Sequence, residues 1–91
     1  MFVVVCYDIP DDRRRDRVYR LLKDYGTPVQ RSVFECELKE KQYGQMRREL
    51  QAVLNPQEDN VRFYRLCRAC RDEVETVGEV PVTVDPLFYF I

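Results

Sequence analysis

The feature that most constrains the fold is the opening stretch MFVVVCYDIP, residues 1–10. Residues 2–6 form an unbroken apolar run rich in β-branched side chains, which is typical of a strand covered on both faces in the middle of a sheet. Tyr7 and Asp8 follow directly, so a carboxylate stands where the chain leaves the sheet before a helix begins. Polar groups that carry chemistry in α/β layouts gather at that edge. The sequence therefore places a candidate site at Asp8.

The chain has 91 residues, of which 45% are hydrophobic and 12% aromatic. This composition suits one domain over 1–91 with a modest core. Because a core of this size gains from burying further apolar surface in an oligomer, we expect at least a homodimer. The start of the chain lacks a signal-peptide pattern, and no apolar run reaches the roughly 18 residues of a membrane span. We therefore expect a soluble, cytoplasmic protein with no membrane partner.

The net charge of −1 conceals an uneven distribution along the chain. Positions 13–31 carry seven basic and two acidic residues, whereas positions 72–91 carry five acidic residues and no basic one. A local excess of basic residues can form a face that binds phosphates even when the net charge is close to zero. A nucleic-acid partner therefore stays compatible with the composition.

Capping residues and apolar spacing predict the first helix. Asp11 or Asp12 can cap its start, and Gly26 can end it in the left-handed conformation. Apolar residues recur between them at i, i+3, i+4 and i+7, as expected for a stripe that packs on a sheet; they are Val18, Leu21, Leu22 and Tyr25.

The rest of the chain alternates in the same way between strand and helix patterns. A strand is predicted over 29–38, where a bulge near Val33 would split it in two. A helix is predicted over 39–54, a strand over 60–67, and a short strand over 74–77 that Gly78 ends. Strands interleaved with two helices predict an α+β, ferredoxin-like sandwich, a small antiparallel sheet covered by two helices.

The C-terminal tail, 78–91, closes on five bulky apolar residues that need a partner surface. The simplest partner is a second copy of the chain, so we expect a C-terminal strand exchanged in a homodimer. The alternative is that the tail folds back on its own sheet.

Cys67 and Cys70 form a C-x-x-C pair, and Cys6 and Cys36 lie inside strand patterns. A structural zinc site needs four ligands, and the chain contains no histidine. The pair is interpreted either as a metal or redox site, with metal ligation requiring a dimer, or as structural thiols in a reducing compartment.

Without histidine the chain has no Ser/His or Cys/His pair, and its three glycines form no phosphate-binding loop. Carboxylates remain as the candidate catalytic groups. Mg²⁺ is held by one or two carboxylates together with water and substrate phosphate, which favours Asp8 as a metal ligand. Alternatively, Asp8 only caps the turn that follows the strand.

The arginines of the first helix also have two interpretations. Arg13, Arg17 and Arg20 fall on a face away from the apolar stripe, which is ordinary for a solvated helix face. Their clustering beside the end of the Asp8 strand favours phosphate binding instead.

Several stretches in order resemble the small CRISPR-associated adaptation nuclease family. Residues 61–67 with Cys70 resemble a recurring form of that family. The order strand-YDI, helix and G-x-x-VQ-x-SVFE is specific, and the likeness covers essentially the whole chain. The matching residues are Tyr7, Asp8, Ile9, Arg15, Arg17, Val18, Tyr25, Gly26, Val29, Gln30, Ser32, Val33, Phe34 and Glu35.

The resemblance implies a ferredoxin-like homodimer that works with the CRISPR integrase when new spacers are captured. It also implies a metal-dependent endonuclease that cuts single-stranded RNA or double-stranded DNA. Asp8 matches the family's catalytic, metal-binding aspartate, and two copies of Asp8 hold Mg²⁺ or Mn²⁺ between them. Tyr7, Arg15, Arg17 and Phe34 match positions linked with activity or substrate contact, where arginines bind phosphate.

One position departs from the family pattern. Many members carry an arginine just before the Val-Gln pair, and here that residue is Pro28. Arg31 is the nearest substitute for a nucleic-acid contact, but an odd shift along a strand turns its side chain to the other face.

Two further function classes stay open. The first is a non-catalytic dimeric adaptor that scaffolds the integrase and binds DNA along its basic helix, and one carboxylate per chain without a histidine favours this role over cleavage in the complete assembly. The second is a small regulatory ligand-binding domain, because the same fold serves many functions.

Overall fold

Strand β1 (Phe2–Asp8) lies inside a four-stranded antiparallel sheet with the order β2-β3-β1-β4. The structure, a computed structural model, describes residues 1–78. The order of elements and of strands is that of a ferredoxin-like fold, which confirms the predicted fold class. The remaining elements are α1 (Asp12–Lys23), β2 (Thr27–Gln30), β3 (Val33–Glu37), α2 (Glu40–Val53), β4 (Asn60–Leu66) and α3 (Arg68–Asp72).

The two faces of β1 have different surroundings. Val3 and Val5 are fully buried on the face toward the helices, and Tyr7 is 8% exposed on the same face. Val4 and Cys6 point to the opposite face and are only partly buried. The prediction that β1 is covered on both faces is therefore confirmed only for the face toward the helices.

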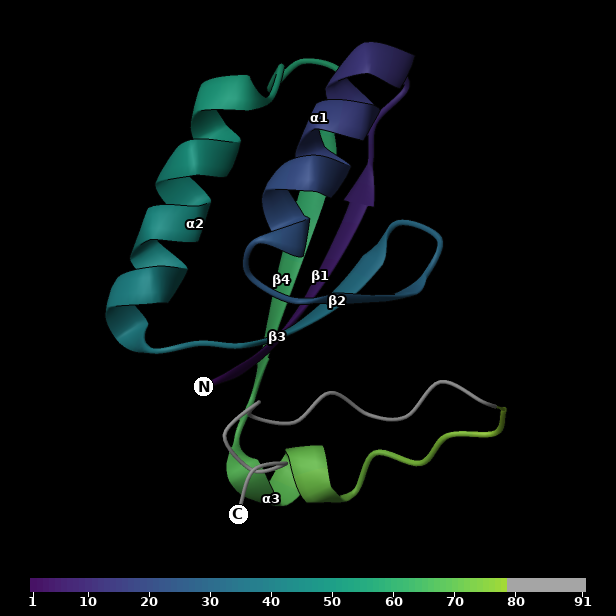
Figure 1. Cartoon of the computed structure of the whole chain (residues 1–91), viewed down its shortest axis with the longest axis vertical. Helices are drawn as coiled ribbons and strands as arrows, with labels where there is room; N and C mark the ends of the chain where they lie inside the picture. The colour runs from purple at the N-terminus through teal and green to yellow at the C-terminus, as the bar shows by residue number, and fades with distance from the viewer. Residues whose placement is uncertain (79–91) are drawn as a thin grey trace.

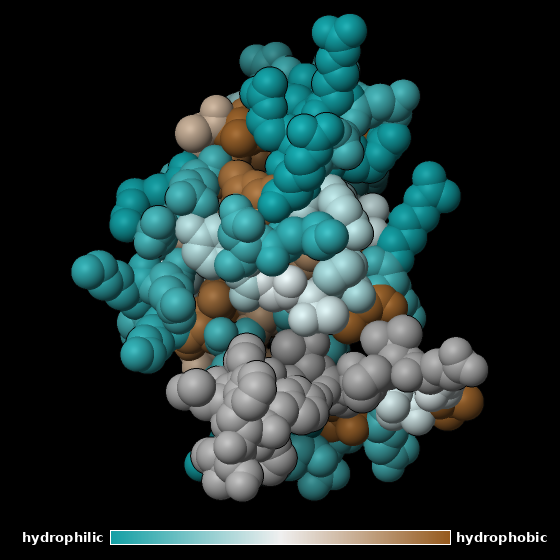
Figure 2. Space-filling view, viewed as in Figure 1, coloured by the Kyte–Doolittle hydropathy of each residue, from teal (hydrophilic) through white to brown (hydrophobic). Residues whose placement is uncertain are grey.

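Helices α1 and α2 contact each other and lie side by side on one face of the sheet (Figure 1). Hydrophilic residues cover most of their outer surface, and hydrophobic ones show between them (Figure 2). The core between helices and sheet is dominated by Val3, Val5, Tyr7, Val18, Leu22, Phe34, Cys36, Tyr43, Met46 and Leu50. The two helices leave the other face of the sheet open, with Val4, Cys6, Val33 and Tyr64 on it.

Asp11 caps α1, as one of the two predicted caps: its carboxylate accepts a hydrogen bond from the Arg14 N–H at 2.9 Å. Val18 and Leu22 are fully buried, which confirms the predicted apolar stripe. The prediction of a left-handed Gly26 is wrong, because within residues 1–78 only Gly78 is a glycine with positive φ.

Gly26 is needed for space. A Cβ at this position would lie 2.4 Å from Cys36 Sγ and 2.4 Å from the Glu35 carbonyl oxygen. We expect Gly26→Ala to lower the free energy of unfolding by about 1–3 kcal/mol, because β3 must shift. Gly44→Ala in α2 is the control, since its Cβ meets only the end of the Arg48 side chain at 3.4 Å and alanine favours the helix by up to about 1 kcal/mol. Urea unfolding compares the two variants, and a Gly26→Ala protein as stable as the wild type would contradict the prediction.

The strand predicted over 29–38 is two strands, β2 and β3, joined by a turn at Arg31 and Ser32. Ser32 has a φ of 62°, in the left-handed region that reverses the chain. The β2–β3 register is irregular between Pro28 and Gln30. Arg31 therefore lies exposed in a turn, and the strand-parity argument that directed it to the other face is wrong.

The helix predicted over 39–54 and the strand predicted over 60–67 are confirmed as α2 and β4. The short strand predicted over 74–77 is wrong, because these residues form neither strand nor helix. The chain forms α3 instead, directly after β4. The predicted dimer contact and exchanged strand of the tail lie outside the described residues, Gly78 excepted, and stay predictions. In the part of the chain described, no helix has the length and apolar character needed to cross a membrane.

Candidate nucleic-acid and metal site

The end of β1 presents its last two side chains to opposite faces of the sheet. Tyr7 points toward the helices and is buried, whereas Asp8 lies exposed on the open face opposite Asn60 of β4. Within residues 1–78, the Asp8 carboxylate accepts no hydrogen bond and forms no ion pair. Asp8 is therefore available to a ligand, and the alternative that it caps the following turn is not supported, since Asp11 caps α1.

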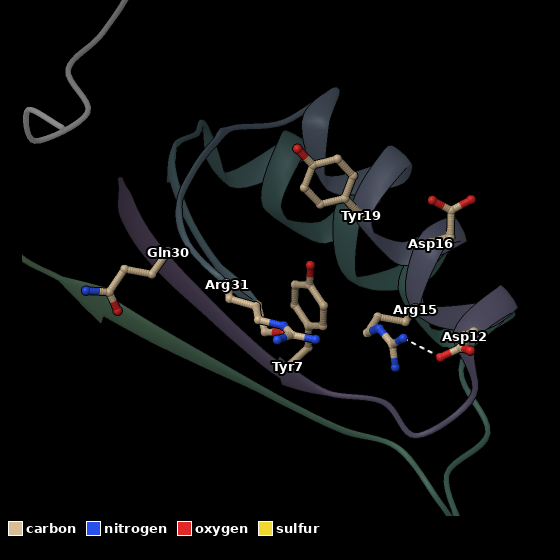
Figure 3. Close-up of a pocket in the computed structure, with 8 residues that line it drawn as sticks. Tyr7, Asp12, Arg15, Asp16, Tyr19, Gln30 and Arg31 are labelled. Carbon is tan, nitrogen blue, oxygen red and sulfur yellow. Dashed lines mark hydrogen bonds and ion pairs between the residues drawn. The ribbon is translucent and has the colours of Figure 1, made fainter. Parts of the chain in front are cut away.

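A cavity of about 310 Å³ opens on the Tyr7 side of β1, between α1 and the β2–β3 turn. Figure 3 shows the α1 side chains and the Tyr7 ring that reach toward it. The cavity combines two phenol rings, two guanidinium groups and two carboxylates, which suits a polar, partly aromatic ligand. Its lining is Tyr7, Asp12, Arg15, Asp16, Tyr19, Gln30, Arg31 and Ser32.

Phe34 supports this cavity from the core. Its side chain is fully buried, and its ring centroid lies 6.3 Å from that of Tyr7 and 5.4 Å from that of Tyr19, the latter edge to face. A fully buried ring cannot touch a nucleic acid in this conformation. The prediction that Phe34 contacts the substrate is therefore corrected to a positioning role for the two tyrosines.

Tyr7 is a hydrogen-bonding group in its neutral form. Burial raises its pKa above the ordinary value, with a smaller contribution from Tyr19, although Arg15 and a hydrogen bond with Ser32 act in the opposite direction. Its backbone N–H also donates to the Ser32 carbonyl at 3.1 Å. Tyr7 is thus fixed against the turn as a neutral hydroxyl.

The arginines of α1 differ in how firmly they are held. Arg15 Nη1 donates to the Ile9 carbonyl at 3.0 Å, and its Nη2 pairs with Asp12, so this guanidinium is fixed at the exit of β1. Arg20 pairs with Asp16. Arg13 and Arg17 are exposed and form no hydrogen bond or ion pair with any described residue. The last two are therefore the arginines of α1 available to phosphate, one helical turn apart.

Arg14 has a structural role that the sequence does not reveal. Its Nε donates to Asp59 Oδ2 at 2.8 Å and its Nη2 to Glu58 at 2.9 Å, so it ties α1 to the loop before β4. The Asp59 side chain is fully buried and also accepts the Asn55 N–H at 2.9 Å. These partners are about 45 positions apart in the chain, and no local pattern connects them.

The Arg14–Asp59 pair makes stability depend on pH. The hydrogen bond from Arg14 holds the pKa of Asp59 below its ordinary value of about 4. Since the unfolded chain then binds the proton more readily, the pair stabilises the fold above about pH 4 and loses this effect as the pH falls further. We expect the stability advantage of the wild type over Asp59→Asn to shrink between about pH 6 and about pH 2. Urea unfolding across this range measures it, and an advantage that is constant with pH would contradict the assignment.

Asp8 alone does not make a metal site. Within residues 1–78 no group of three or more acidic, cysteine or histidine side chains is placed to hold an ion. The hard carboxylate oxygens of Asp8 nevertheless fit Mg²⁺ or Mn²⁺, which take one or two protein carboxylates and complete their shell with water and phosphate. Another copy of the chain can supply a second carboxylate.

Comparison with known proteins identifies similar chains. The family model described as CRISPR associated protein Cas2 matches residues 1–74, which include Asp8, α1 and the lining of the cavity. A Chloroflexus aurantiacus protein named CRISPR-associated endoribonuclease Cas2 1 is 43% identical over 89% of this chain and 88% of its own length. A Thermus thermophilus protein named CRISPR-associated endonuclease Cas2 2 is 46% identical over 85% and 83%, respectively.

Solved structures agree with this similarity. A crystal structure of a hypothetical protein from Thermus thermophilus superposes with a TM-score of 0.79 at 41% identity and covers 89% of this chain and 94% of that one. A chain of a structure titled "Partial Cas6-RT-Cas1--Cas2 complex" gives a TM-score of 0.74 at 27% identity, over 91% and 96% of the two chains.

Proposed function

Because the chain belongs to the CRISPR-associated Cas2 family, we propose that it is a cytoplasmic, metal-dependent endonuclease that works with the CRISPR integrase in spacer acquisition. The reaction is hydrolysis of phosphodiester bonds in single-stranded RNA or double-stranded DNA. The names of the relatives, endoribonuclease and endonuclease, support the reaction. The Cas1–Cas2 complex among the structural neighbours supports the integrase as a partner.

The single observation that carries the proposal is the free Asp8 carboxylate at the end of the central strand, on the face that α1 and α2 leave open. We propose that two copies of the chain form a homodimer through this face. Apolar side chains on it, Val4 and Val33 among them, are only partly buried in one chain and would gain burial in the dimer. The two Asp8 side chains would then approach each other across the interface.

Each group of the site has a task in this reaction. A divalent ion, when bound by the paired Asp8 carboxylates, supplies Lewis-acid chemistry that activates water and offsets charge on the phosphate. Arg13 and Arg17 bind the flanking backbone phosphates. Tyr7 and Arg15 hold a nucleotide in the cavity. Tyr7 donates a hydrogen bond from its neutral hydroxyl, and the Arg15 guanidinium stays fixed at the exit of β1.

A cleavage time course tests the proposal. The purified wild-type protein is incubated with single-stranded RNA or duplex DNA in the presence of Mg²⁺, Mn²⁺ or a chelator. We expect cleavage with the metal and none with the chelator. Cleavage that persists in the chelator would contradict the metal-dependent mechanism, and no cleavage of either substrate with either metal would contradict the nuclease.

The exposed arginines of α1 support a second function, a dimeric adaptor that holds DNA for the integrase without cutting it. This function requires phosphate contacts and no catalytic carboxylate. Both functions can belong to one protein, and we propose that the scaffold role contributes more to spacer capture than cleavage does.

The adaptor makes a prediction about salt dependence. With a chelator present, we expect Arg17→Ala to weaken duplex binding and to reduce the slope of log affinity against log salt concentration by about 1 for each phosphate that is no longer neutralised, and so by about 2 when both copies of Arg17 in the dimer contact the duplex. Lys41→Ala removes the same charge from an exposed position on the other long helix, α2, and serves as the control. Fluorescence anisotropy at several salt concentrations measures both slopes. Equal slopes for Arg17→Ala and Lys41→Ala would contradict phosphate binding by Arg17.

A further inference from the structure

Two exposed cysteines at the start of α3 take no part in the site described above. Cys67 is the N-cap residue of α3, and Cys70 lies in its first turn. The Cys70 N–H donates to Cys67 Sγ at 3.4 Å. The structure therefore holds two accessible thiols within one helical turn, with the Cys67 sulfur turned toward Cys70.

This arrangement makes the two thiols chemically unequal. Hydrogen bonds from Cys70, first from its backbone N–H and then from its thiol, lower the pKa of Cys67. The same thiol contact raises the pKa of Cys70. Cys36 differs from both, because burial raises its pKa to about 12. A thiol that ionises readily attacks other sulfurs, whereas a buried thiol of high pKa is inert.

The backbone allows the two sulfurs to join. Residues three apart in a helix have Cα atoms about 5 Å apart, and disulfides form when this distance is about 4.4–6.8 Å. Cys67 adopts extended backbone angles, φ −68° and ψ 166°, and its sulfur already turns toward the first turn of α3, where Cys70 lies.

We propose that Cys67 and Cys70 form a reversible dithiol–disulfide site that exchanges with small-molecule disulfides. The Cys67 thiolate attacks one sulfur of the small disulfide, forms a mixed disulfide and releases one small thiolate. Cys70 then loses its proton and attacks the Cys67 sulfur, which releases the second small thiolate. The protein is oxidised by two electrons, the small disulfide is reduced to two thiols, and the two protein protons end on them.

The position of α3 connects this chemistry to the sheet. Arg71 follows Cys70, and its guanidinium carbon lies 5.3 Å from the centroid of the Phe2 ring. Its Nε lies 3.9 Å from Glu37 Oε2. Phe2 and Glu37 are paired on the face of the sheet opposite the long helices. A disulfide in the first turn of α3 therefore forms beside the residue that anchors this helix to the sheet. The proposal is independent of the nuclease, since neither thiol contacts Asp8 or the cavity.

The test titrates the full-length protein in oxygen-free buffers of reduced and oxidised glutathione. Remaining thiols are alkylated and the cysteine-containing peptides are identified by mass spectrometry. We expect the free thiols of Cys67 and Cys70 to disappear together as one intramolecular disulfide forms. The Cys36 thiol should still be alkylated after the protein is unfolded. We expect Cys70→Ser to lose this disulfide and to accumulate a mixed glutathione disulfide at Cys67. Cys67→Ser should lose both products, and Cys6→Ser should behave as the wild type.

Three results would overturn the proposal. The first is that both thiols stay reduced in excess oxidised glutathione. The second is that the disulfides formed connect two chains or involve Cys6. The third is that zinc copurifies with the protein and protects both thiols from alkylation until a chelator removes it, which would make the pair half of a metal site shared by two chains.

Discussion

Asp8→Asn is expected to reduce metal-dependent cleavage by about 1,000-fold or more. Asparagine keeps the shape of the side chain but removes its charge, so the pair of Asp8 side chains proposed to hold the ion no longer does so. Metal ions stabilise the transition state by several kcal/mol, and each 1.4 kcal/mol corresponds to about a tenfold change in rate. The fold should be unaffected, because the Asp8 side chain is exposed and makes no polar contact with the described residues.

Asp24→Asn is the matched control for this prediction. Asp24 is also an exposed aspartate, but it lies at the other end of α1. Cleavage rates of both variants are measured with Mg²⁺ and Mn²⁺, together with the oligomeric state and the urea midpoint. Cleavage by Asp8→Asn at the wild-type rate would place the catalytic carboxylate elsewhere, or indicate that the activity comes from a contaminant.

The same variant separates the nuclease from the adaptor. If the scaffold role dominates spacer capture, Asp8→Asn should still support it in a complete assembly with the integrase. Failure of spacer capture with Asp8→Asn, in a protein that still forms the dimer and binds the integrase, would contradict the adaptor as the main role. Duplex binding in a chelator should be unchanged in either case, because it depends on the arginines of α1.

Local patterns were sufficient for the elements whose neighbours are set by side-chain periodicity. The apolar run of β1 predicted an interior strand, and the stripe that includes Val18 and Leu22 predicted the buried face of α1. In each case the spacing of the apolar residues in the sequence matches the period of the strand or helix, so the sequence alone determines which side chains point inward.

The failures concern contacts between residues distant in the chain. Gly26 was interpreted as a cap, whereas its role is the close approach of Cys36, which no local pattern records. The partners of Arg14 lie in the loop before β4, so its charge was attributed to the same basic face as that of its neighbours. The turn at Ser32 depends on one left-handed residue other than glycine, and such a residue carries almost no sequence signal.

In the candidate site, too, local patterns predicted some features and missed others. Strand parity places Asp8 and Tyr7 on opposite faces, and the sequence therefore identified both positions. It could not show that Arg15 and Arg20 are paired within α1 while Arg13 and Arg17 have no described partner. That distinction depends on side-chain conformations, which the spacing of charges does not determine.

Phe34→Ala is expected to lower the free energy of unfolding by about 3–5 kcal/mol, the usual cost of removing a buried phenylalanine ring. The side chain is fully buried between β3 and α1 and contacts the rings of Tyr7 and Tyr19, so its removal leaves a cavity at the centre of the site. Domains of this size have a total stability of about 5–15 kcal/mol. The variant should therefore be marginally folded, and urea unfolding at a fixed protein concentration measures the change.

Phe34→Leu distinguishes a positioning role from a role in the core alone. Leucine keeps most of the buried volume and should cost less stability than alanine, but it removes the ring that orients Tyr7 and Tyr19. If Phe34 only positions these tyrosines, Phe34→Leu should slow cleavage while leaving the salt slope of DNA binding unchanged, since every basic group that binds phosphate is still present. A reduced slope would indicate that the binding surface has changed. Wild-type cleavage in Phe34→Leu would show that the ring contributes to the core alone, because the two tyrosines would then not depend on it.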